Sequence, residues 1–210
     1  VSGFSMARAG TSAPASGAEH LISHYWDMEE HGQGRPVRAL HGTQVGIGTR
    51  ISSRTLWRLI GLDSADILRA AKSAHARRPD SSWIDALGEH HPDLTDEIVD
   101  EIRTQFREKQ RHGDELQREL EALSHGWEPI RAALEAILVP TERIDRALEE
   151  AGCITRASEL AVSREHLIRT IKTCRHIRSR YVNFDLLADL GLLDAMAGEI
   201  VEEIEGAVHV

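Results

Sequence analysis

The sequence has few aromatic residues, few cysteines and no long apolar run. Aromatic residues make up 4% of the 210 positions, and Cys153 and Cys174 stand far apart without a CxxC pair. A disulfide framework is therefore not expected, and two ordinary thiols fit a reducing compartment. No segment approaches the roughly 20 apolar residues that span a bilayer, and no basic-then-apolar leader opens the chain. We expect a cytoplasmic protein with no membrane partner.

Basic residues are also in the minority. The chain has 34 acidic and 25 basic residues and a formal net charge of -9. This balance excludes a general electrostatic attraction to nucleic acid, so small-molecule or protein partners are expected. The hydrophobic content of 41% is enough for one sizeable core. We therefore expect a single domain over residues 1–210.

Apolar residues rarely alternate with polar ones, whereas Ala, Leu, Glu and Arg recur at spacings of three and four. This periodicity predicts an all-α helical bundle. The expected helices cover residues 16–32, 41–61, 64–76, 81–89, 92–111, 114–124, 128–138, 141–152, 163–178 and 185–205, the last broken near Gly191. Residues 10–17 are expected to form a loop of small residues.

Three histidines stand out in the run GAEHLISHYWDMEEHGQGRPVRALHG. Ser16 and Glu19 form an S-x-x-E capping box, which predicts a helix that carries His20 and His24 on one face. His41 opens the next, apolar helix. Imidazoles gathered in this way indicate a metal site, with either His20 and His24 or His20 and His41 as a ligand pair. The alternative is that they form hydrogen bonds within a helix interface. The peptidase pattern H-E-x-x-H is absent.

Gly42, Gly46 and Gly48 lie near the start of the second predicted helix. Each would cost about 1 kcal/mol relative to alanine inside a helix. Their presence indicates a close approach of another backbone or a ligand. We interpret it as packing against the helix that carries His20 and His24.

The segments GAEHLISHYWDM and ALHGTQVGIGT resemble the second domain of sn-glycerol-1-phosphate dehydrogenases, in the superfamily of iron-containing alcohol dehydrogenases and dehydroquinate synthases. SGFSMARAGTSAPASG and IKTCRHIRSRYVNFDLLADLGLL are similar to other parts of that domain. The resemblance implies a bundle like the C-terminal domain of dehydroquinate synthase-like proteins. It also implies that His20 and His41 bind a divalent metal (Zn, Ni or Fe), and that His24 lies beside the site as a proton-relay or substrate contact.

The implied reaction is the reduction of dihydroxyacetone phosphate to sn-glycerol 1-phosphate by NAD(P)H, a step of phospholipid metabolism. No Gly-rich phosphate loop follows a strand in this sequence. The family's N-terminal nucleotide-binding domain is therefore expected to be missing, and NAD(P) to bind through it. The chain alone is then expected to turn over NAD(P)H poorly. Relatives are commonly dimers or larger, so a homo-oligomer is expected.

The family's third metal ligand, an aspartate, also has no counterpart upstream of the histidines. Asp27 and Glu30 are on the same predicted helix, but a solvated helix face is the favoured interpretation of both. For the small phosphorylated substrate, Ser16 and Arg180 are the candidate contacts. Arg180 belongs to a basic group with Arg175 and Arg178, for which a solvated helix C-terminus is the alternative.

Two other functions stay open at this point. One keeps the fold and changes the substrate to another polyol or ketone, or the reaction to a dehydroquinate-synthase-like cyclisation. The other is a non-catalytic helical interaction module, which the missing domain and the missing aspartate favour. Rings of His20 and His41 that face apart would contradict the enzymatic interpretation.

Overall fold

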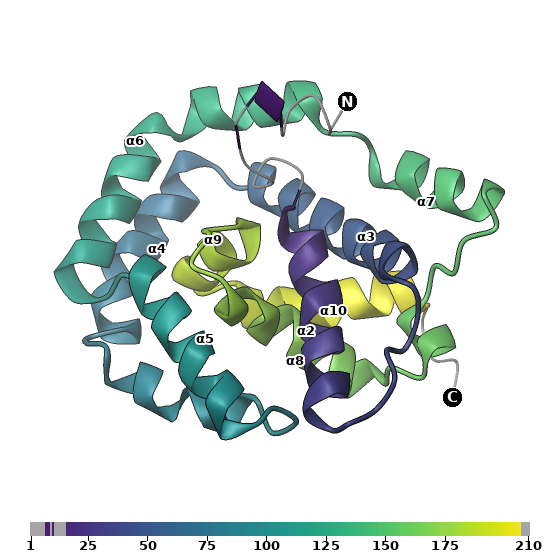
Figure 1. Ribbon diagram of the computed structural model, residues 1–210. Helices are drawn as coiled ribbons and strands as arrows, with labels where there is room; N and C mark the ends of the chain where they lie inside the picture. The colour runs from purple at the N-terminus through teal and green to yellow at the C-terminus, as the bar shows by residue number, and fades with distance from the viewer. Residues whose placement is uncertain (1–6, 9, 11–15, 207–210) are drawn as a thin grey trace.

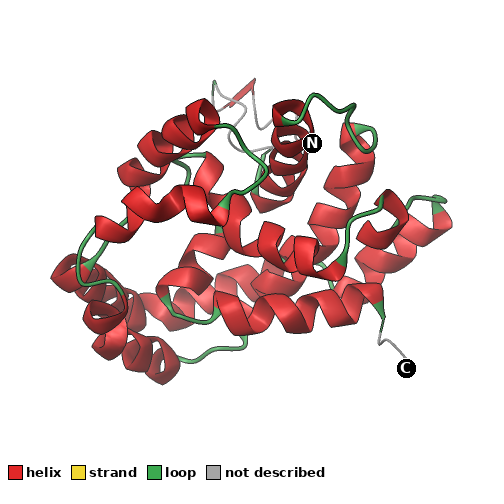
Figure 2. Ribbon diagram, turned by 90° about the horizontal axis from the view of Figure 1, so that it is seen from below, coloured by secondary structure: helices red, strands yellow, loops and turns green. Residues whose placement is uncertain are grey.

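The computed structural model of the protein describes residues 7–8, 10 and 16–206. These residues form helices and no strand (Figure 1 and Figure 2), which confirms the all-α prediction. The α-helices are α2 (Ala18–Gly32), α3 (His41–Ile60), α4 (Ser64–Arg77), α5 (Asp96–Lys109), α6 (Gly113–Ile137), α7 (Thr141–Glu150), α8 (Arg164–Thr173), α9 (Asn183–Asp189) and α10 (Leu193–Glu205). The 3-10 helices are η2 (Ser82–His90), η3 (Ala157–Leu160) and η4 (Cys174–Ile177). None of these helices is long and apolar enough to cross a membrane. Most of the loop expected over residues 10–17 lies outside the described residues.

Helix α2 packs against α3 (Figure 1) and also against α8 and η4. Its apolar face is almost completely buried and consists of Leu21, Ile22, Tyr25 and Trp26. This spacing is the stripe by which an amphipathic helix joins a core. The indole Nε1 of Trp26 donates a 3.0 Å hydrogen bond to Oγ1 of Thr170 on α8. The helix that carries His20 and His24 is therefore held by α3, α8 and η4.

Helix α6 is one continuous helix of 25 residues, although the sequence predicted a break at residues 125–127. Pro129 lies inside it and lacks the N–H that would bond to His125 four residues earlier. Both residues are exposed, so water can reach the freed carbonyl group. Trp127 is buried, its Nε1 donates over 2.8 Å to the carbonyl of Leu62 just before α4, and α6 packs along α4. Packing along α4 thus favours continuation of the helix through the proline.

Two further segments differ in helix type from the expectation. Residues 81–89 form the 3-10 helix η2 rather than an α-helix, and residues 163–178 divide into α8 and η4. Ser163 caps α8 by accepting a hydrogen bond from the backbone N–H of His166. The predicted break at Gly191 is confirmed, because this residue has a φ of +75° in the region that glycine adopts most readily.

Gly48 sets how closely α2 and α3 approach each other. A Cβ atom at position 48 would lie 2.5 Å from the carbonyl oxygen of Glu19 and 3.0 Å from its Cα. The close approach predicted for this helix is therefore confirmed at Gly48. It is absent at Gly42, where a Cβ would meet no described atom within 4 Å, and Gly46 faces Leu148 of α7 instead of α2.

A Gly48→Ala substitution is expected to lower the free energy of unfolding by about 2 kcal/mol, because overpacked interfaces must move apart. Urea unfolding followed by circular dichroism measures this loss. Gly46→Ala is the matched control on the same helix, since its Cβ would meet Leu148 at an ordinary 3.7 Å. Equal losses in the two variants would contradict the role of Gly48 as the contact point.

A chain of buried polar side chains joins α2 to η4. The hydroxyl of Tyr25 lies 3.0 Å from Nδ1 of His91, and Nε2 of His91 lies 3.0 Å from Nδ1 of His176. Burial lowers the pKa of His91 to about 4, with further lowering from the positive charges of His90 and Arg169. Burial also lowers the pKa of His176. Both rings are therefore neutral at pH 7, when each can donate from one nitrogen and accept at the other.

Helix α7 lies at the edge of the molecule (Figure 1), and none of its side chains is fully buried. Asp145 attaches it to α3 by accepting hydrogen bonds from Arg50 Nε over 2.7 Å and from Arg54 Nη2 over 2.6 Å. Burial of Asp145 acts in the opposite direction, but the two guanidinium groups lower the pKa of this carboxyl to about 2. The carboxylate is therefore charged across the neutral range.

Candidate metal centre

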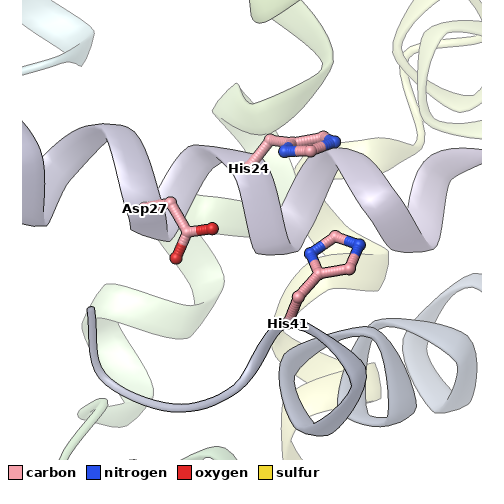
Figure 3. Close-up of side chains that lie close together, drawn as sticks. All are labelled: His24, Asp27 and His41. Atoms are coloured by element: carbon pink, nitrogen blue, oxygen red, sulfur yellow. The ribbon is translucent and has the colours of Figure 1, made fainter.

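The candidate metal centre lies where α2 meets the first residue of α3. His20, His24 and Asp27 follow one another at about one turn of α2 and share a face. His41 begins α3, and its ring lies next to His24 and Asp27 (Figure 3). The centroid of the His41 ring lies 5.2 Å from that of the His20 ring and 5.3 Å from that of the His24 ring. The centroids of the His20 and His24 rings are 6.3 Å apart. All three histidines identified in the sequence therefore converge.

Asp27 adds a carboxylate to this group. One ligand atom each from His24, Asp27 and His41 lies within 4.8 Å of the other two. Imidazoles with a carboxylate are the donors that zinc and iron bind in proteins, so these residues fit a divalent transition metal. His24 and Asp27 are half-buried and His41 is exposed. The group is therefore open to a small molecule on one side.

A chain of hydrogen bonds fixes which nitrogen of His41 carries its proton. The side-chain amide of Gln44 donates from Nε2 to Asp27 over 2.9 Å, so Oε1 of Gln44 accepts the Ser23 hydroxyl over 2.8 Å. Because that hydroxyl hydrogen is used, Ser23 Oγ accepts from Nδ1–H of His41 over 2.8 Å. In the neutral form of His41, Nε2 is then the unprotonated nitrogen, which is the atom that can bind a metal.

Ser23 and Gln44 were not identified as site residues from the sequence. Both are fully buried and polar, and each follows a histidine by three residues, at 20 and 41 respectively. That spacing places them on the histidine face of their helices and is the only sequence signal they offer. Their partners come from the other helix, so the pairing depends on how α2 and α3 cross.

Glu19 holds the ring of His20. Its Oε1 lies 2.9 Å from Nδ1 of His20 and also accepts the backbone N–H of Gly17 over 2.9 Å. Nε2 is therefore the nitrogen that His20 can offer to a ligand. The predicted cap by Ser16 is wrong, since α2 begins after Gly17 without a side-chain cap. Glu19 bonds to that backbone N–H instead.

His24 is in an environment that favours its neutral form. Burial lowers its pKa, and repulsion from His41 and His20, when these rings are protonated, and from Arg178 lowers it further, while Asp27 acts in the opposite direction. A neutral imidazole has a free lone pair at pH 7. The ring can therefore accept a proton or bind a cation.

The two candidate substrate contacts, Ser16 and Arg180, touch each other. The guanidinium of Arg180 donates to the backbone carbonyl of Ser16, which ties the loop after η4 to the start of α2. The basic group considered with Arg180 is dispersed. Arg175 is buried in an ion pair with Asp185, which corrects its interpretation as part of a solvated helix end. Arg178 is exposed and lines a pocket of about 470 Å³ with His24 and Asp27.

Glu30 is not part of the metal centre. It is 3% exposed and forms ion pairs of 2.6 Å with both Arg35 and Arg38. The hydrogen bond from Arg35 lowers the pKa of Glu30 the most. The interpretation of Glu30 as part of a solvated face is therefore wrong, because its charge anchors the loop between α2 and α3.

Comparison with curated proteins identifies relatives of this chain. A protein from Halorubrum lacusprofundi named glycerol-1-phosphate dehydrogenase [NAD(P)+] is 37% identical over 99 aligned residues, which cover 37% of this chain and 27% of the relative. Proteins of the same name match from Pyrococcus furiosus (40% over 98 residues; 38% and 27% covered) and Geobacillus thermodenitrificans (44% over 63 residues; 28% and 15% covered). Part of this chain is therefore similar in sequence to part of these glycerol-1-phosphate dehydrogenases.

The similarity has a limited extent. The chain spans between a quarter and a third of the length of several glycerol-1-phosphate dehydrogenases that it matches. No protein-family model matches the chain. No solved structure gives a significant match. The similarity therefore concerns only part of a glycerol-1-phosphate dehydrogenase.

Proposed function

We propose that residues 1–210 form the helical metal-binding domain of an oxidoreductase of the glycerol-1-phosphate dehydrogenase type. The proposed reaction is the reduction of dihydroxyacetone phosphate to sn-glycerol 1-phosphate with NAD(P)H. A nucleotide-binding domain outside this chain would hold NAD(P), and we expect a cytoplasmic homo-oligomer. The observation that carries the proposal is the convergence of three imidazoles and a carboxylate at the junction of α2 and α3 in a chain similar to part of these enzymes.

We propose His41 as the ligand common to two possible sets. The family resemblance pairs it with His20, whereas the distances between ligand atoms group it with His24 and Asp27. A bound divalent cation would polarise the substrate carbonyl group and stabilise the negative charge that develops on its oxygen. In the first set His24 stays free to contact the substrate or a proton. The side chain of Asp27 then acts through Gln44 and Ser23 to hold the ring of His41.

We propose that basic side chains beside the metal centre bind the phosphate of the substrate. Arg178 lines the pocket with His24 and Asp27, and a guanidinium matches phosphate oxygens through paired hydrogen bonds. Arg180, with Ser16 as its partner, shapes the adjoining loop. Ser16 and Arg180 are thus proposed to position the phosphate end of the substrate.

Metal content and NAD(P)H oxidation test the proposal in the full-length protein. His41→Ala is expected to lower metal affinity and activity with dihydroxyacetone phosphate by at least about tenfold, since even outer-shell partners contribute that much. Comparing His20→Ala with His24→Ala separates the two ligand sets, because only a true ligand lowers the metal content. His125→Ala on the exposed face of α6 is the control histidine. Full activity in a variant lacking both His20 and His41 would refute the assignment.

The same measurements on the full-length protein distinguish the remaining functions. Bound metal with activity on another polyol or ketone would favour the related dehydrogenase, and a cyclisation would favour the dehydroquinate-synthase-like enzyme. Absence of metal and of any turnover in the full-length protein would favour the interaction module.

A further inference from the structure

The carboxylate of Asp27 lies beside the imidazoles of the candidate metal centre. Among the described residues, His24, Asp27 and His41 are the one group of histidine, cysteine or acidic side chains whose ligand atoms all lie within 4.8 Å of one another. Figure 3 shows His24 and Asp27 on α2 and His41 at the start of α3 around a shared space. An ion that binds its ligands at about 2.0 to 2.2 Å holds them no more than about 4.4 Å apart. Small side-chain movements therefore bring the three ligand atoms to one ion.

Asp27 shares an ion more readily with His24 than with His20. Asp27 follows His20 by seven residues, or about 10 Å along the helix axis, but follows His24 by only three, or about 4.5 Å. A site that uses the Asp27 carboxylate therefore takes its imidazole on α2 from His24. Two neutral imidazoles with one carboxylate are also a donor set of catalytic zinc sites, which keep a fourth position open for a substrate or water.

One pair of buried side chains orients both Asp27 and His41. Gln44 donates from Nε2 to Oδ1 of Asp27 over 2.9 Å, which leaves Oδ2 of the carboxylate for an ion. Oε1 of Gln44 accepts from the Ser23 hydroxyl, and Ser23 Oγ lies 2.8 Å from Nδ1 of His41, which leaves Nε2 of that ring for the same ion. Carboxylates and imidazoles that bind metals are usually held by such outer hydrogen bonds. The two side chains are therefore preorganised as a pair of ligands.

The pocket beside the metal centre favours the same set of residues. This pocket of about 470 Å³ is lined by His24 and Asp27, whereas His20 is not part of its lining. Arg178, the proposed phosphate contact, lines it as well. An ion held by His24 and Asp27 would therefore face the same space as the guanidinium group of Arg178.

We propose that His24, Asp27 and His41 are the ligands of the divalent ion. Asp27 supplies the carboxylate for which the sequence upstream of the histidines has no counterpart. His20, which the family resemblance pairs with His41, is left as an imidazole beside the ion, with its ring centroid 5.2 Å from that of His41. His20 then takes the role of substrate or proton contact that the resemblance gives to His24. This inference rests on the proposed function, because it assigns the ligands of the same metal centre.

Cysteine substitution with Co²⁺ as the probe tests Asp27 as a ligand. The full-length protein is stripped of metal, and Cys153→Ser removes the exposed native thiol from every variant, while Cys174 is buried. A thiolate bound to Co²⁺ adds a charge-transfer band in the near ultraviolet that carboxylates and imidazoles do not give. The band is expected in Asp27→Cys with one equivalent of Co²⁺ and not in Glu101→Cys, whose side chain lines the same pocket. An Asp27→Cys variant without the band overturns the proposal.

The affinity for Co²⁺ separates a ligand from a residue that only positions His41. Asp27→Asn keeps an oxygen that accepts from Gln44 but loses the negative charge. It is expected to weaken Co²⁺ binding by at least about tenfold, since even outer-shell partners contribute that much. Glu101→Gln is the matched control, because it removes the same charge from the same pocket. An equal loss in the control, or none in Asp27→Asn, overturns the proposal.

The histidine variants complete the assignment. His24→Ala is expected to weaken Co²⁺ binding as Asp27→Asn does, whereas His20→Ala is expected to bind Co²⁺ nearly as the parent protein does. Circular dichroism verifies that the variants fold. A loss in His20→Ala with unchanged affinity in His24→Ala and Asp27→Asn overturns this ligand set and leaves the proposed function intact. A parent protein that binds no divalent metal overturns both.

Discussion

Replacement of Asp185 by alanine is expected to lower the free energy of unfolding by about 3 to 5 kcal/mol, the usual cost of breaking a buried ion pair from one side. Asp185 is 2% exposed and accepts from Lys109 Nζ over 2.8 Å and from Arg175 Nη1 over 3.0 Å. Both cations are themselves buried. The variant would leave two positive charges inside the core with no carboxylate between them, and the α5, η4 and α9 segments that they join would separate.

Guanidinium chloride unfolding at pH 7, followed by circular dichroism, measures this effect. Asp194→Ala is the matched control, since Asp194 also pairs with a lysine, Lys172, over 3.1 Å, but its side chain is 87% exposed. Exposed pairs contribute little to stability, so the control is expected to unfold nearly as the parent does. Similar unfolding midpoints for the two variants would show that the buried pair is not a main contributor to stability.

Acidification from pH 7 to pH 4 is expected to cost about 3 kcal/mol of stability through His91 alone, from the difference between its folded and unfolded pKa values. Burial lowers the pKa of His91 to about 4 in the folded protein, against about 6.5 in the unfolded chain. Between these values the unfolded state binds a proton that the folded state does not. The contribution is therefore complete above pH 6.5 and is lost as the pH falls toward 4. His176 acts with the same sign, because its pKa is also lowered.

Urea unfolding at pH 7, 5.5 and 4.5 checks this expectation. Because carboxylates also titrate in this range, the decisive quantity is the difference between the parent and His91→Gln, which cannot be protonated. The pH dependence of the variant is expected to be shallower. His125→Gln on the exposed surface of α6 is the control and should follow the parent. If the His91→Gln curve ran parallel to the parent curve, the buried ring would not be the group that responds.

The helical fold could be predicted from the sequence wherever the apolar periodicity agrees with the positions of the glycines and prolines that end helices. The start of α3 at His41 follows from the glycines and the proline that precede it in the sequence. The break at Gly191 follows from that glycine itself. The continuation of α6 through Pro129 could not be predicted, because it depends on packing along α4 and on the exposure of the proline. Likewise, the start of α2 depends on which side chain, that of Ser16 or that of Glu19, bonds to the backbone there. Glu19 does so, rather than Ser16.

The candidate site was predictable along one helix and not between two. The spacing of His20 and His24 places them on one face of α2 by helix geometry alone, and Asp27 could have been found by extending the same spacing. The position of His41 against that face depends on the backbone contact at Gly48. Ser23 and Gln44 acquire their roles only through that contact, because each bonds across the helix pair.

The attachment of α7 through one carboxylate has a consequence for how the protein opens. Because α7 adds no fully buried side chain to the core, detaching it forfeits the contacts of Asp145 with Arg50 and Arg54 and the partial burial of Ile144 and Leu148 against the rest of the protein. Local unfolding of such a segment requires far less free energy than global unfolding. The amide hydrogens of this helix should therefore exchange with deuterium well before those of α2 or α3, as a separate cooperative unit.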